Sequence, residues 1–323
     1  MKKSLVSVIM SVYREEPLWL RESIESILSQ SYGDLEFIIV LDDPKNRELE
    51  EIIEEYAVRD GRIVFMTNDM NRGLIYSLNR ALKLAKGEYI ARMDADDIAR
   101  SDRLEKQLFY LKENGLDLVG SNVNLFKGDR EVFFTTDKLL SHKYIEKILL
   151  AGTIGIVHPT FFAKKEVFEK LGGYANAPHA EDKEFLARLF CNGFHVGNMK
   201  EVLLECRYSL NSMTKNNAVY VNMVGSYITE CFRECQKSKK YFFDEKKISS
   251  MQVSQGQKER FNRKRLLLDK VREALNEKRY IVFLIQISKA LFYSRTLLDN
   301  IRINLLLKYY RIRENFEQRH VQP

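Results

Sequence analysis

The sequence predicts an α/β fold with a mostly parallel central sheet, helices on both faces of that sheet, and a helical extension at the C-terminus. Two observations predict it. Short apolar runs rich in β-branched residues alternate with segments of helical spacing through the first hundred residues. From about residue 215 onward, only helical patterns remain. Continuous apolar strands joined by helices indicate a parallel sheet that is covered on both sides.

The first half of the chain repeats a strand–helix cycle. Strands are expected at residues 5–12, 35–41, 62–66 and 87–93. Helices are expected at residues 18–30, 48–57, 74–85 and 102–114. Ligands of such sheets bind beyond the carboxyl ends of the strands. We therefore expect one rim to be lined by the four segments that leave these ends, at residues 13–15, 42–44, 67–72 and 94–97.

The pattern loosens after the fourth helix. A strand is expected at residues 116–125 and a helix at about 142–150. The run IVHPTFFA (156–163) is interpreted as a strand that leads into an amphipathic helix. Gly172 and Gly173 are a stop signal that ends this helix.

Composition places the chain among globular proteins. It has 323 residues, of which 45% are hydrophobic, and the 30% of charged residues argue against a buried membrane bundle. No run of about 18 or more uncharged apolar residues occurs, so no transmembrane helix is expected. The first apolar run is brief and no small-residue cleavage site precedes Arg14. We interpret it as the first strand of a cytoplasmic protein and not as a signal peptide.

The cysteines give no sign of a metal site. Cys191, Cys206, Cys231 and Cys235 include no CxxC pair and lack metal-finger spacing. Cys231 and Cys235 share a helix face, which predicts buried thiols. Reduced thiols agree with a cytoplasmic compartment.

The positive charge is concentrated in the last quarter of the chain. The net charge is +7, but residues 241–323 hold 18 Lys and Arg against 9 Asp and Glu, while the remainder holds 34 against 36. Apolar faces flanked by basic residues suit an anionic membrane surface. Alternatively, this region is a helical hairpin packed on the rest of the chain with a solvated basic face, or a dimer contact. Nucleic-acid binding is not expected, because the rim is acidic and no such motif occurs.

Three aspartates crowd the end of the fourth strand. Asp94, Asp96 and Asp97 fall within four positions. Mg²⁺ and Mn²⁺ take oxygen ligands and need only one or two carboxylates when they also bind phosphates. Helix capping is the alternative, but one Asp would suffice for that. The cluster therefore predicts a metal or nucleotide site.

Two further acidic pairs allow more than one interpretation. The pair Asp42-Asp43, which is followed by Pro44 and Asn46, either forms an Asx-type turn before a helix or supplies a carboxylate that accepts a hydrogen bond from the N–H of a pyrimidine base. Arg72 can face a diphosphate. Glu181 and Asp182 fall in the first turn of a helix expected at residues 180–193, where they either complement the helix dipole or supply a general base.

Other common site types lack their sequence signals. The five histidines show no HxxxH spacing, which argues against a zinc enzyme. No GxGxxG, GxxxxGK[ST] or GxSxG motif occurs. Dinucleotide, P-loop and serine-hydrolase sites are therefore not expected.

From Val6 to Thr214 the chain resembles the inverting, nucleotide-sugar-dependent glycosyltransferases of family 2, which have the GT-A fold. The similarity lies in the order and spacing of VSVIMSVYREE, FIIVLDDPKN, NRGLIYSLNRALKLAKGEYIARMDADD, HPTFFAKKEVFEKLGGY and AEDKEFLARL. Within the family it is most similar to bacterial capsule and O-antigen transferases. The resemblance implies a catalytic domain at residues 1–214, with a nucleotide-sugar half at about 1–100 and an acceptor half at about 101–214, and a helical basic region at 215–323.

The resemblance also implies roles for individual residues. A nucleotide pocket is expected near Val12, Tyr13, Glu15, Asp42, Arg72, Asp94 and Asp96. Asp94-Ala95-Asp96 matches the DxD-type motif of the family, and Asp96 and Asp97 are expected to contact the ribose and a divalent metal. Asp182 falls on the position of the catalytic base. Glu181 beside it and His158, on an expected strand, are placed on the acceptor side.

Two departures from the family pattern stand out. Arg14 occupies a position that is usually Asn, and the common VDDGS turn is LDDPKN here. Late in the domain, Arg207 aligns with the Arg of a YRxH stretch and Ser209 with its metal-binding His. The second departure implies weaker metal binding, and it leaves a catalytically weak or inactive nucleotide-sugar-binding protein as the alternative function.

The expected activity is the Mn²⁺- or Mg²⁺-dependent transfer of a sugar, with inversion, from a nucleotide sugar to a saccharide hydroxyl. The resemblance favours UDP as the nucleotide and a lipid-linked acceptor. It places the enzyme on the inner face of the cell membrane as a peripheral protein, with a homodimer as a further possibility.

Overall fold

The computed structural model describes residues 4–128, 130–137, 140–208 and 217–277, and the single positions 279, 282, 285, 309 and 313. In this part of the chain, one sheet has the strand order β3-β2-β1-β4-β8-β6-β9-β5, and β7 pairs with β6 beside it. The strands are β1 (Val6–Val12), β2 (Leu35–Leu41), β3 (Ile63–Thr67), β4 (Tyr89–Asp94), β5 (Ile98–Ala99), β6 (Leu118–Lys127), β7 (Glu131–Thr135), β8 (Phe162–Lys164) and β9 (Val196–Arg207).

The sheet divides into a parallel part and a mixed part. β1 to β4 are parallel, as the sequence predicts. β8 runs antiparallel to β4 and to β6, whereas β9 runs parallel to β6. The sequence did not predict β5, β7 or β9. β7 is exposed at all five positions and β9 pairs with register shifts, so neither shows a regular alternation of apolar and polar residues.

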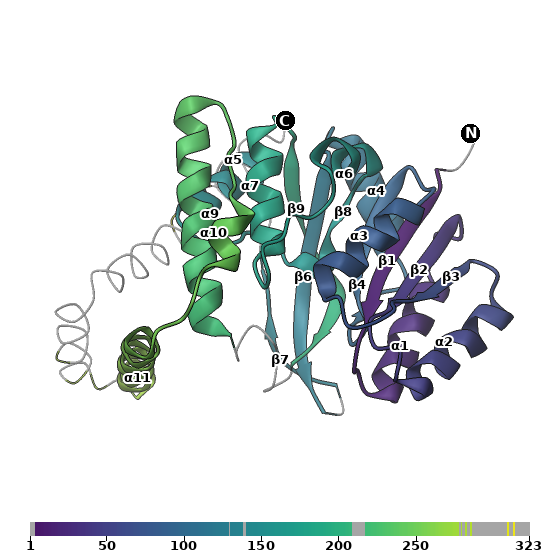
Figure 1. Cartoon of the computed structure of the whole chain (residues 1–323), viewed down its shortest axis with the longest axis horizontal. Coiled ribbons are helices and arrows are strands. Elements are labelled where there is room, and N and C mark those ends of the chain that lie inside the picture. Colours follow the sequence, from purple (N-terminus) through teal and green to yellow (C-terminus); the bar gives the residue numbers. More distant parts are fainter. Residues whose placement is uncertain are drawn as a thin grey trace.

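Helices cover both faces of the sheet (Figure 1). They are α1 (Pro17–Leu28), α2 (Arg47–Arg59), α3 (Leu74–Leu84), α4 (Arg103–Glu113), α5 (His142–Leu150), α6 (Lys165–Leu171), α7 (Glu181–Cys191), α9 (Ala218–Ser238), α10 (Glu245–Ser249) and α11 (Gln255–Asn276). α1, α2 and α4 form one hydrophobic core with the sheet, and α3, α5, α6, α7, α9 and α10 form the other. Side chains alternate between the two cores along each strand, because successive residues of a strand point to opposite faces. Val8 and Met10 enter the first core and Ile9 enters the second.

The prediction of one long strand at residues 156–163 is wrong. The strand β8 begins only at Phe162, and His158 starts the 3₁₀ turn η1 (His158–Thr160). Pro159 has no N–H and a fixed φ, so it cannot continue a sheet ladder. The Thr160 hydroxyl and N–H both bond the Val157 carbonyl, at 2.7 and 2.9 Å, and close the turn.

The prediction of four reduced thiols is also wrong. Cys191 at the end of α7 forms a disulfide with Cys235 on α9, and their Cα atoms are 6.3 Å apart. Cys206 and Cys231 are buried free thiols. The pairing follows from the packing of α9 against α7 and joins residues 44 positions apart, so local spacing could not reveal it.

α9 and α10 of the C-terminal region pack against the α/β domain. Phe185 of α7 shares its core with Val224, Ile228 and Phe232 of α9 and with Ile248 of α10, and Figure 1 shows these helices side by side. None of the described helices is long and apolar enough to cross a membrane. Ser209 and the residues after 277, apart from the five single positions, lie outside the described residues.

Candidate functional site

The segments at the carboxyl ends of β1, β2 and β3 meet at one rim, as predicted. The Arg14 guanidinium, which follows β1, pairs with the Asp43 carboxylate after β2 at 3.0 Å. The buried Val12 ends β1, and its carbonyl accepts a hydrogen bond from the Asp42 amide at 2.7 Å. The guanidinium of Arg14 also lies 4.8 Å from the ring centre of Tyr13.

Asp42 organises the loop between β3 and α3. Its carboxylate is 2% exposed. It accepts hydrogen bonds from the Asn68 side chain at 2.6 Å and from the amides of Arg72 and Gly73 at 2.8 and 2.7 Å. Gly73 has a φ of 84°, which favours glycine. This structural role was not predicted for Asp42, and its contact with a nucleotide stays a prediction.

Arg72 lies on the outside of this rim. Its guanidinium pairs with Asp69 at 2.6 Å and lies 5.6 Å from the ring centre of Tyr76. The side chain is 41% exposed. It is therefore accessible to an anionic ligand, as the sequence analysis expects.

The three aspartates after β4 form a compact acidic cluster. Each of Asp94, Asp96 and Asp97 offers a carboxylate oxygen, and these oxygens lie within 4.8 Å of one another. Burial raises the pKa of Asp96 to about 6, and the charge of Asp94 adds to this. Burial and the charges of Asp96 and Asp94 also hold the pKa of Asp97 well above its usual range. Burial raises the pKa of Glu15 to about 7, and the charges of Asp96 and Asp94 add to it.

Arg207 at the end of β9 holds the turn of the acidic cluster. Its amide donates to the Asp97 carboxylate at 2.9 Å and its Nε donates to the Asp96 carbonyl at 3.1 Å. The guanidinium lies between the rings of Trp19 and Phe126, 4.8 and 4.6 Å from their centres. It also pairs with Glu22 of α1 at 2.6 Å.

The second acidic group begins α7. Glu181 is 6% exposed, whereas Asp182 is partly exposed. Burial raises the pKa of Glu181 to about 7, and the charge of Asp182 adds to it. Burial also raises the pKa of Asp182, against the hydrogen bond that its Oδ1 accepts from the Lys183 amide at 2.6 Å. His158 lies beside this pair, with its Nδ1 3.6 Å from Glu181 Oε1 and its Nε2 3.0 Å from the Tyr174 hydroxyl.

Arg92 is a site residue that the sequence analysis missed. It lies on β4, its side chain is 4% exposed, and its Nη2 pairs with Asp94 Oδ1 at 2.5 Å. Its Nε and Nη1 find no hydrogen-bond partner among the described residues. The charge of Arg92 lowers the pKa of both Glu181 and Asp182. The available signal was the single cation inside the apolar run YIARM.

Lys183 fixes the start of α7 to the C-terminal region. Its side chain is buried, and its ammonium donates to the carbonyls of Gly152 and Gly225 at 2.8 and 2.7 Å. Burial lowers the pKa of Lys183 to about 8. This anchor connects α7 directly to α9.

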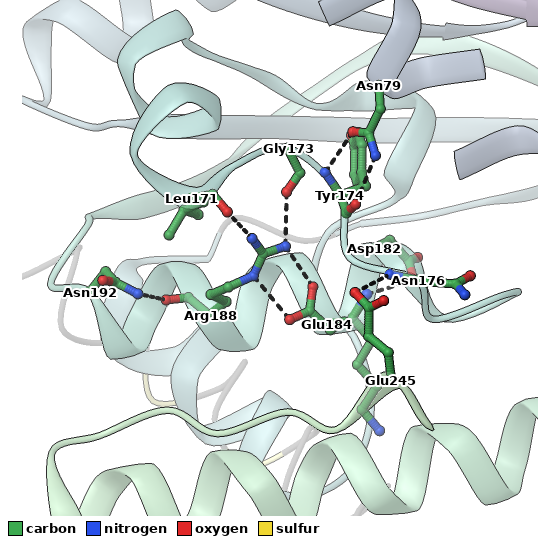
Figure 2. Close-up of polar contacts among 11 residues, drawn as sticks. Asn79, Leu171, Gly173, Tyr174, Asn176, Asp182, Glu184, Arg188, Asn192 and Glu245 are labelled. Atoms are coloured by element: carbon green, nitrogen blue, oxygen red, sulfur yellow. Dashed lines mark hydrogen bonds and ion pairs between the residues drawn. The ribbon is translucent and has the colours of Figure 1, made fainter. Parts of the chain in front are cut away.

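The loop before α7 is held at three places (Figure 2). Arg188 donates to the carbonyls of Leu171 and Gly173 and pairs with Glu184. The Asn79 amide bonds both backbone groups of Tyr174 at 2.8 Å. Glu245 of α10 accepts from the Asn176 amide at 3.0 Å. The acidic pair of α7 is thus positioned by β4, η1, α3 and α10 together.

The two acidic groups suit different chemistry. The oxygen-only cluster of Asp94, Asp96 and Asp97 fits a divalent cation, because close carboxylates whose pKa values are raised by burial and mutual repulsion gain from a positive partner. Asp182 is the partly exposed residue in the otherwise buried first turn of α7, and its Oδ2 has no hydrogen bond to another side chain among the described residues. That oxygen can take a proton from a ligand hydroxyl.

Residues 7–172 match the family described as Glycosyl transferase family 2. An uncharacterized glycosyltransferase of Methanocaldococcus jannaschii is 40% identical over 210 residues, which is 64% of this chain and 72% of that protein. The O-antigen biosynthesis glycosyltransferase WbnJ of Escherichia coli is 32% identical over 232 residues, which is 71% of this chain and 90% of that protein.

A further relative has a lipid-linked acceptor in its name. It is the Escherichia coli UDP-Gal:alpha-D-GlcNAc-diphosphoundecaprenol beta-1,3-galactosyltransferase, 29% identical over 218 residues, which is 66% of this chain and 78% of that protein. Among solved structures, S. aureus TarS 1–349 in complex with UDP-GlcNAc matches with a TM-score of 0.55 and 16% identity, over 78% of this chain and 77% of that one. The structural match concerns the fold alone.

Proposed function

Since the chain belongs to glycosyl transferase family 2 and is a glycosyltransferase with the GT-A fold, we propose that it transfers a sugar, with inversion, from a UDP-linked donor to a saccharide hydroxyl. One observation carries the proposal. One buried cation, Arg92, pairs with Asp94 of the metal-compatible cluster at 2.5 Å, and its charge also lowers the pKa of Glu181 and Asp182. A transferase needs both kinds of group at one site, one for the diphosphate and one for the acceptor proton.

The donor end of the proposed site lies along the rim of β1 to β4. The partly exposed ring of Tyr13 and the exposed guanidinium of Arg72 are placed to contact the base and the diphosphate. Glu15, Asp42 and Val12 shape the floor of this rim, Asp94 and Asp96 complete the proposed nucleotide pocket, and Asp96 and Asp97 would contact the ribose and the metal. Asp94, Asp96 and Asp97 would hold Mn²⁺ or Mg²⁺. When bound, the ion neutralises charge on the departing diphosphate.

The acceptor end lies at the start of α7. The acceptor oxygen attacks C1 of the donor sugar from the face opposite the diphosphate, and its proton passes to Asp182 Oδ2. The new C1–O bond forms as the C1–O bond to the diphosphate breaks, and UDP leaves with that electron pair. Asp182 Oδ1 stays bonded to the Lys183 amide, which fixes the carboxylate plane. Glu181 and His158 lie next to the base and position the acceptor.

We propose a lipid-linked acceptor and a peripheral position on the cytoplasmic face of the membrane. The name of one relative supports the lipid-linked acceptor, and the basic region 241–323 supports an anionic surface as the partner. A homodimer through this region is compatible with the same features. We keep residues 1–214 as the proposed catalytic domain and residues 215–323 as the membrane-facing region. α9 and α10 share the catalytic core, so the functional division does not separate two independent cores.

A panel of nucleotide sugars tests the proposal. The full chain is incubated with UDP-, GDP- and dTDP-sugars, with and without Mn²⁺, and both thermal stabilisation and release of the nucleotide are measured. A UDP-sugar should stabilise the chain and be hydrolysed slowly only when Mn²⁺ is present. Stabilisation by no nucleotide sugar would contradict the proposal. Stabilisation without any hydrolysis or transfer favours the inactive binding protein that Ser209 leaves open.

A further inference from the structure

Arg92 is a buried cation with unused hydrogen-bond donors. Its Nη2 pairs with Asp94, but its Nε and Nη1 have no partner among the described residues. A buried donor without a partner costs about 1–3 kcal/mol, and most such groups in native proteins have a specific reason. The backbone of Arg92 is fully used, because its N–H donates to the Phe161 carbonyl at 2.9 Å and its carbonyl accepts from Arg103 at 2.7 Å.

The same contacts connect Arg92 to the acceptor end. Arg103 Nη2 also donates to the Pro159 carbonyl at 2.8 Å, so β4 and the turn η1 are held together. η1 begins with His158, which lies 3.6 Å from Glu181. Arg92 is thus placed between Asp94 at the donor end and the start of α7 at the acceptor end.

We propose that Arg92 is a positioning residue for the transfer reaction, whose guanidinium fixes Asp94 and serves as the counter-charge that keeps the carboxylates of Glu181 and Asp182 ionised. The inference rests on the proposed function. It adds a role for Arg92 at both the donor end, at Asp94, and the acceptor end, at the start of α7. The free Nε and Nη1 donors are then available to a carboxylate of α7 or to an oxygen that arrives with the substrates.

Several charged groups surround the α7 pair, and Arg92 is the buried cation whose charge lowers the pKa of both Glu181 and Asp182. Facing the pair are Asp94 and Arg92 from β4, His158 from η1, Tyr174 from the preceding loop and Lys183 from α7 itself. Burial and the charge of Arg92 keep the pKa of His158 well below its usual range, so it is neutral. The ammonium of Lys183 is held by two carbonyls. Loss of the Arg92 charge therefore leaves the pair with Asp94 as a like charge and with less compensation.

The sign of the expected effect follows from the burial of the pair. Burial raises the pKa of Glu181 and Asp182, and the charge of Arg92 opposes this. Removing that charge raises both pKa values further, so a smaller fraction of the proposed base is ionised at a given pH on the acid limb. A higher pH then restores part of the carboxylate. A residue with only a packing role would reduce activity equally at every pH.

Arg103 provides a matched control. It is an arginine of the same domain with 0% exposure, and it contacts the backbone of Arg92 directly. Its recorded partners are the Gln107 side chain, the Met93 sulfur and two carbonyls, with no carboxylate among the described residues. Substitution of Arg103 removes a buried cation and its packing without removing a counter-charge in contact with Asp94.

The experiment compares Arg92→Met, Arg92→Lys and Arg103→Met with the parent chain. The pH profile of kcat/KM is measured from pH 5.5 to 9 with the nucleotide sugar identified above. In Arg92→Met, the acid limb of the kcat/KM profile should move up by about one pH unit or more, which means a loss that approaches ~10-fold on the acid side of the parent's limb and shrinks toward pH 9. Arg92→Lys keeps the positive charge, so the acid limb of its kcat/KM profile should stay near that of the parent chain. Arg103→Met should unfold at a lower temperature with an unshifted limb. The titration of Lys183 near pH 8 is common to all four chains and cancels in the comparison.

A second readout is independent of transfer. Difference infrared spectra between pH 9 and pH 6.5 report the protonation of buried carboxyl groups. Arg92→Met should show additional protonated carboxyl at pH 6.5 that disappears in Arg92→Met combined with Glu181→Gln and Asp182→Asn. A parallel, pH-independent loss in Arg92→Met and Arg103→Met, with unchanged infrared spectra, would overturn the proposal. If the parent chain transfers no sugar, the proposed function fails and the infrared comparison still decides the role of Arg92.

Discussion

The two acidic groups of the site contain the same kinds of side chain in opposite surroundings. Asp94, Asp96 and Asp97 crowd one another, and their turn is held mainly by the backbone and side chain of Arg207. Glu181 and Asp182 start a helix and lie near the charge of Arg92, with a neutral His158 beside them. Arg92 pairs directly with Asp94 of the first group at 2.5 Å, whereas it acts on the second group only through its charge.

This difference suits the two acidic groups to different chemistry. Three crowded carboxylates that share one directly paired cation, Arg92, favour a metal ion, because the ion removes the remaining repulsion and part of the cost of burial. A pair with a partly exposed member favours proton transfer, because burial raises the pKa of Asp182 and so makes its carboxylate a better proton acceptor, while the charge of Arg92 opposes its protonation.

Removal of the proposed base should have the largest effect. Asp182→Asn keeps the shape of the side chain but cannot accept a proton, so the transfer rate should fall by about 1,000-fold or more. Binding of UDP should remain nearly unchanged, because the donor end is intact. Rates come from a transfer assay, and the affinity for UDP from calorimetry. Exposed Asp69, which pairs only with Arg72 in the recorded contacts, provides the control Asp69→Asn, whose transfer rate should stay within a few-fold. Full activity of Asp182→Asn would remove its proposed role.

Loss of a metal ligand should have the next largest effect, and it should be confined to the first group. Asp97→Asn is expected to weaken Mn²⁺ binding by about 100-fold, since even residues that only support a ligand account for 10–100-fold. Trp19 is the single tryptophan of the chain, and it stacks on Arg207, which holds the Asp96–Asp97 turn. Its fluorescence should therefore change on titration with Mn²⁺.

The same titration distinguishes the two acidic groups. Asp182→Asn should bind Mn²⁺ as the parent chain does, and Trp19→Phe should lose the signal without losing binding by calorimetry. An equal loss of Mn²⁺ affinity in Asp97→Asn and Asp182→Asn would show that both groups hold one ion and would end the contrast between them.

The sequence predicted the first group much better than the second. β1 to β4 are uniform apolar runs, and the rule for parallel sheets places the segments after them on one rim, where the structure has them. The surroundings of Glu181 depend on contacts between distant segments. Arg92 reaches this pair only because η1 packs on β4, and Lys183 is anchored only because α9 packs on α7. Such contacts, like the Cys191–Cys235 disulfide, leave no periodic signal in the chain.

The burial of Glu181 predicts a measurable stability difference that depends on pH. Its folded pKa of about 7 lies above the ordinary value of 4.5, so folding favours the protonated form. This contribution is fully present below pH 4.5 and is lost as the pH rises through 7. Glu181→Gln, which is always neutral, should match the parent chain at pH 4 and exceed its free energy of unfolding by about 1–3 kcal/mol at pH 8.

Denaturant unfolding at the two pH values checks this prediction. Glu184→Gln is the control on the same helix, because Glu184 is fully buried but pairs with Arg188 at 2.7 Å. That variant should lower the stability at pH 8, since it leaves Arg188 without its charged partner. If Glu184→Gln also increases the stability at pH 8, the burial of a carboxylate accounts for the effect at Glu181, and the lack of a directly paired cation does not.

The smallest effect is expected for an acidic residue outside both groups. Glu245 of α10 accepts a hydrogen bond from the Asn176 amide and so fixes the loop that leads into α7 (Figure 2). Glu245→Gln keeps an acceptor oxygen but loses the charge, so it should reduce the free energy of unfolding by at most about 1 kcal/mol. The transfer rate should fall less than the affinity for the acceptor, because the loop lies on the acceptor side and the donor rim is untouched. Steady-state kinetics with either substrate varied separate these effects. A rise in the KM for the donor in Glu245→Gln would show that α10 also stabilises the donor end, where Asp94, Asp96 and Asp97 lie. The two acidic groups would then depend on the same helix.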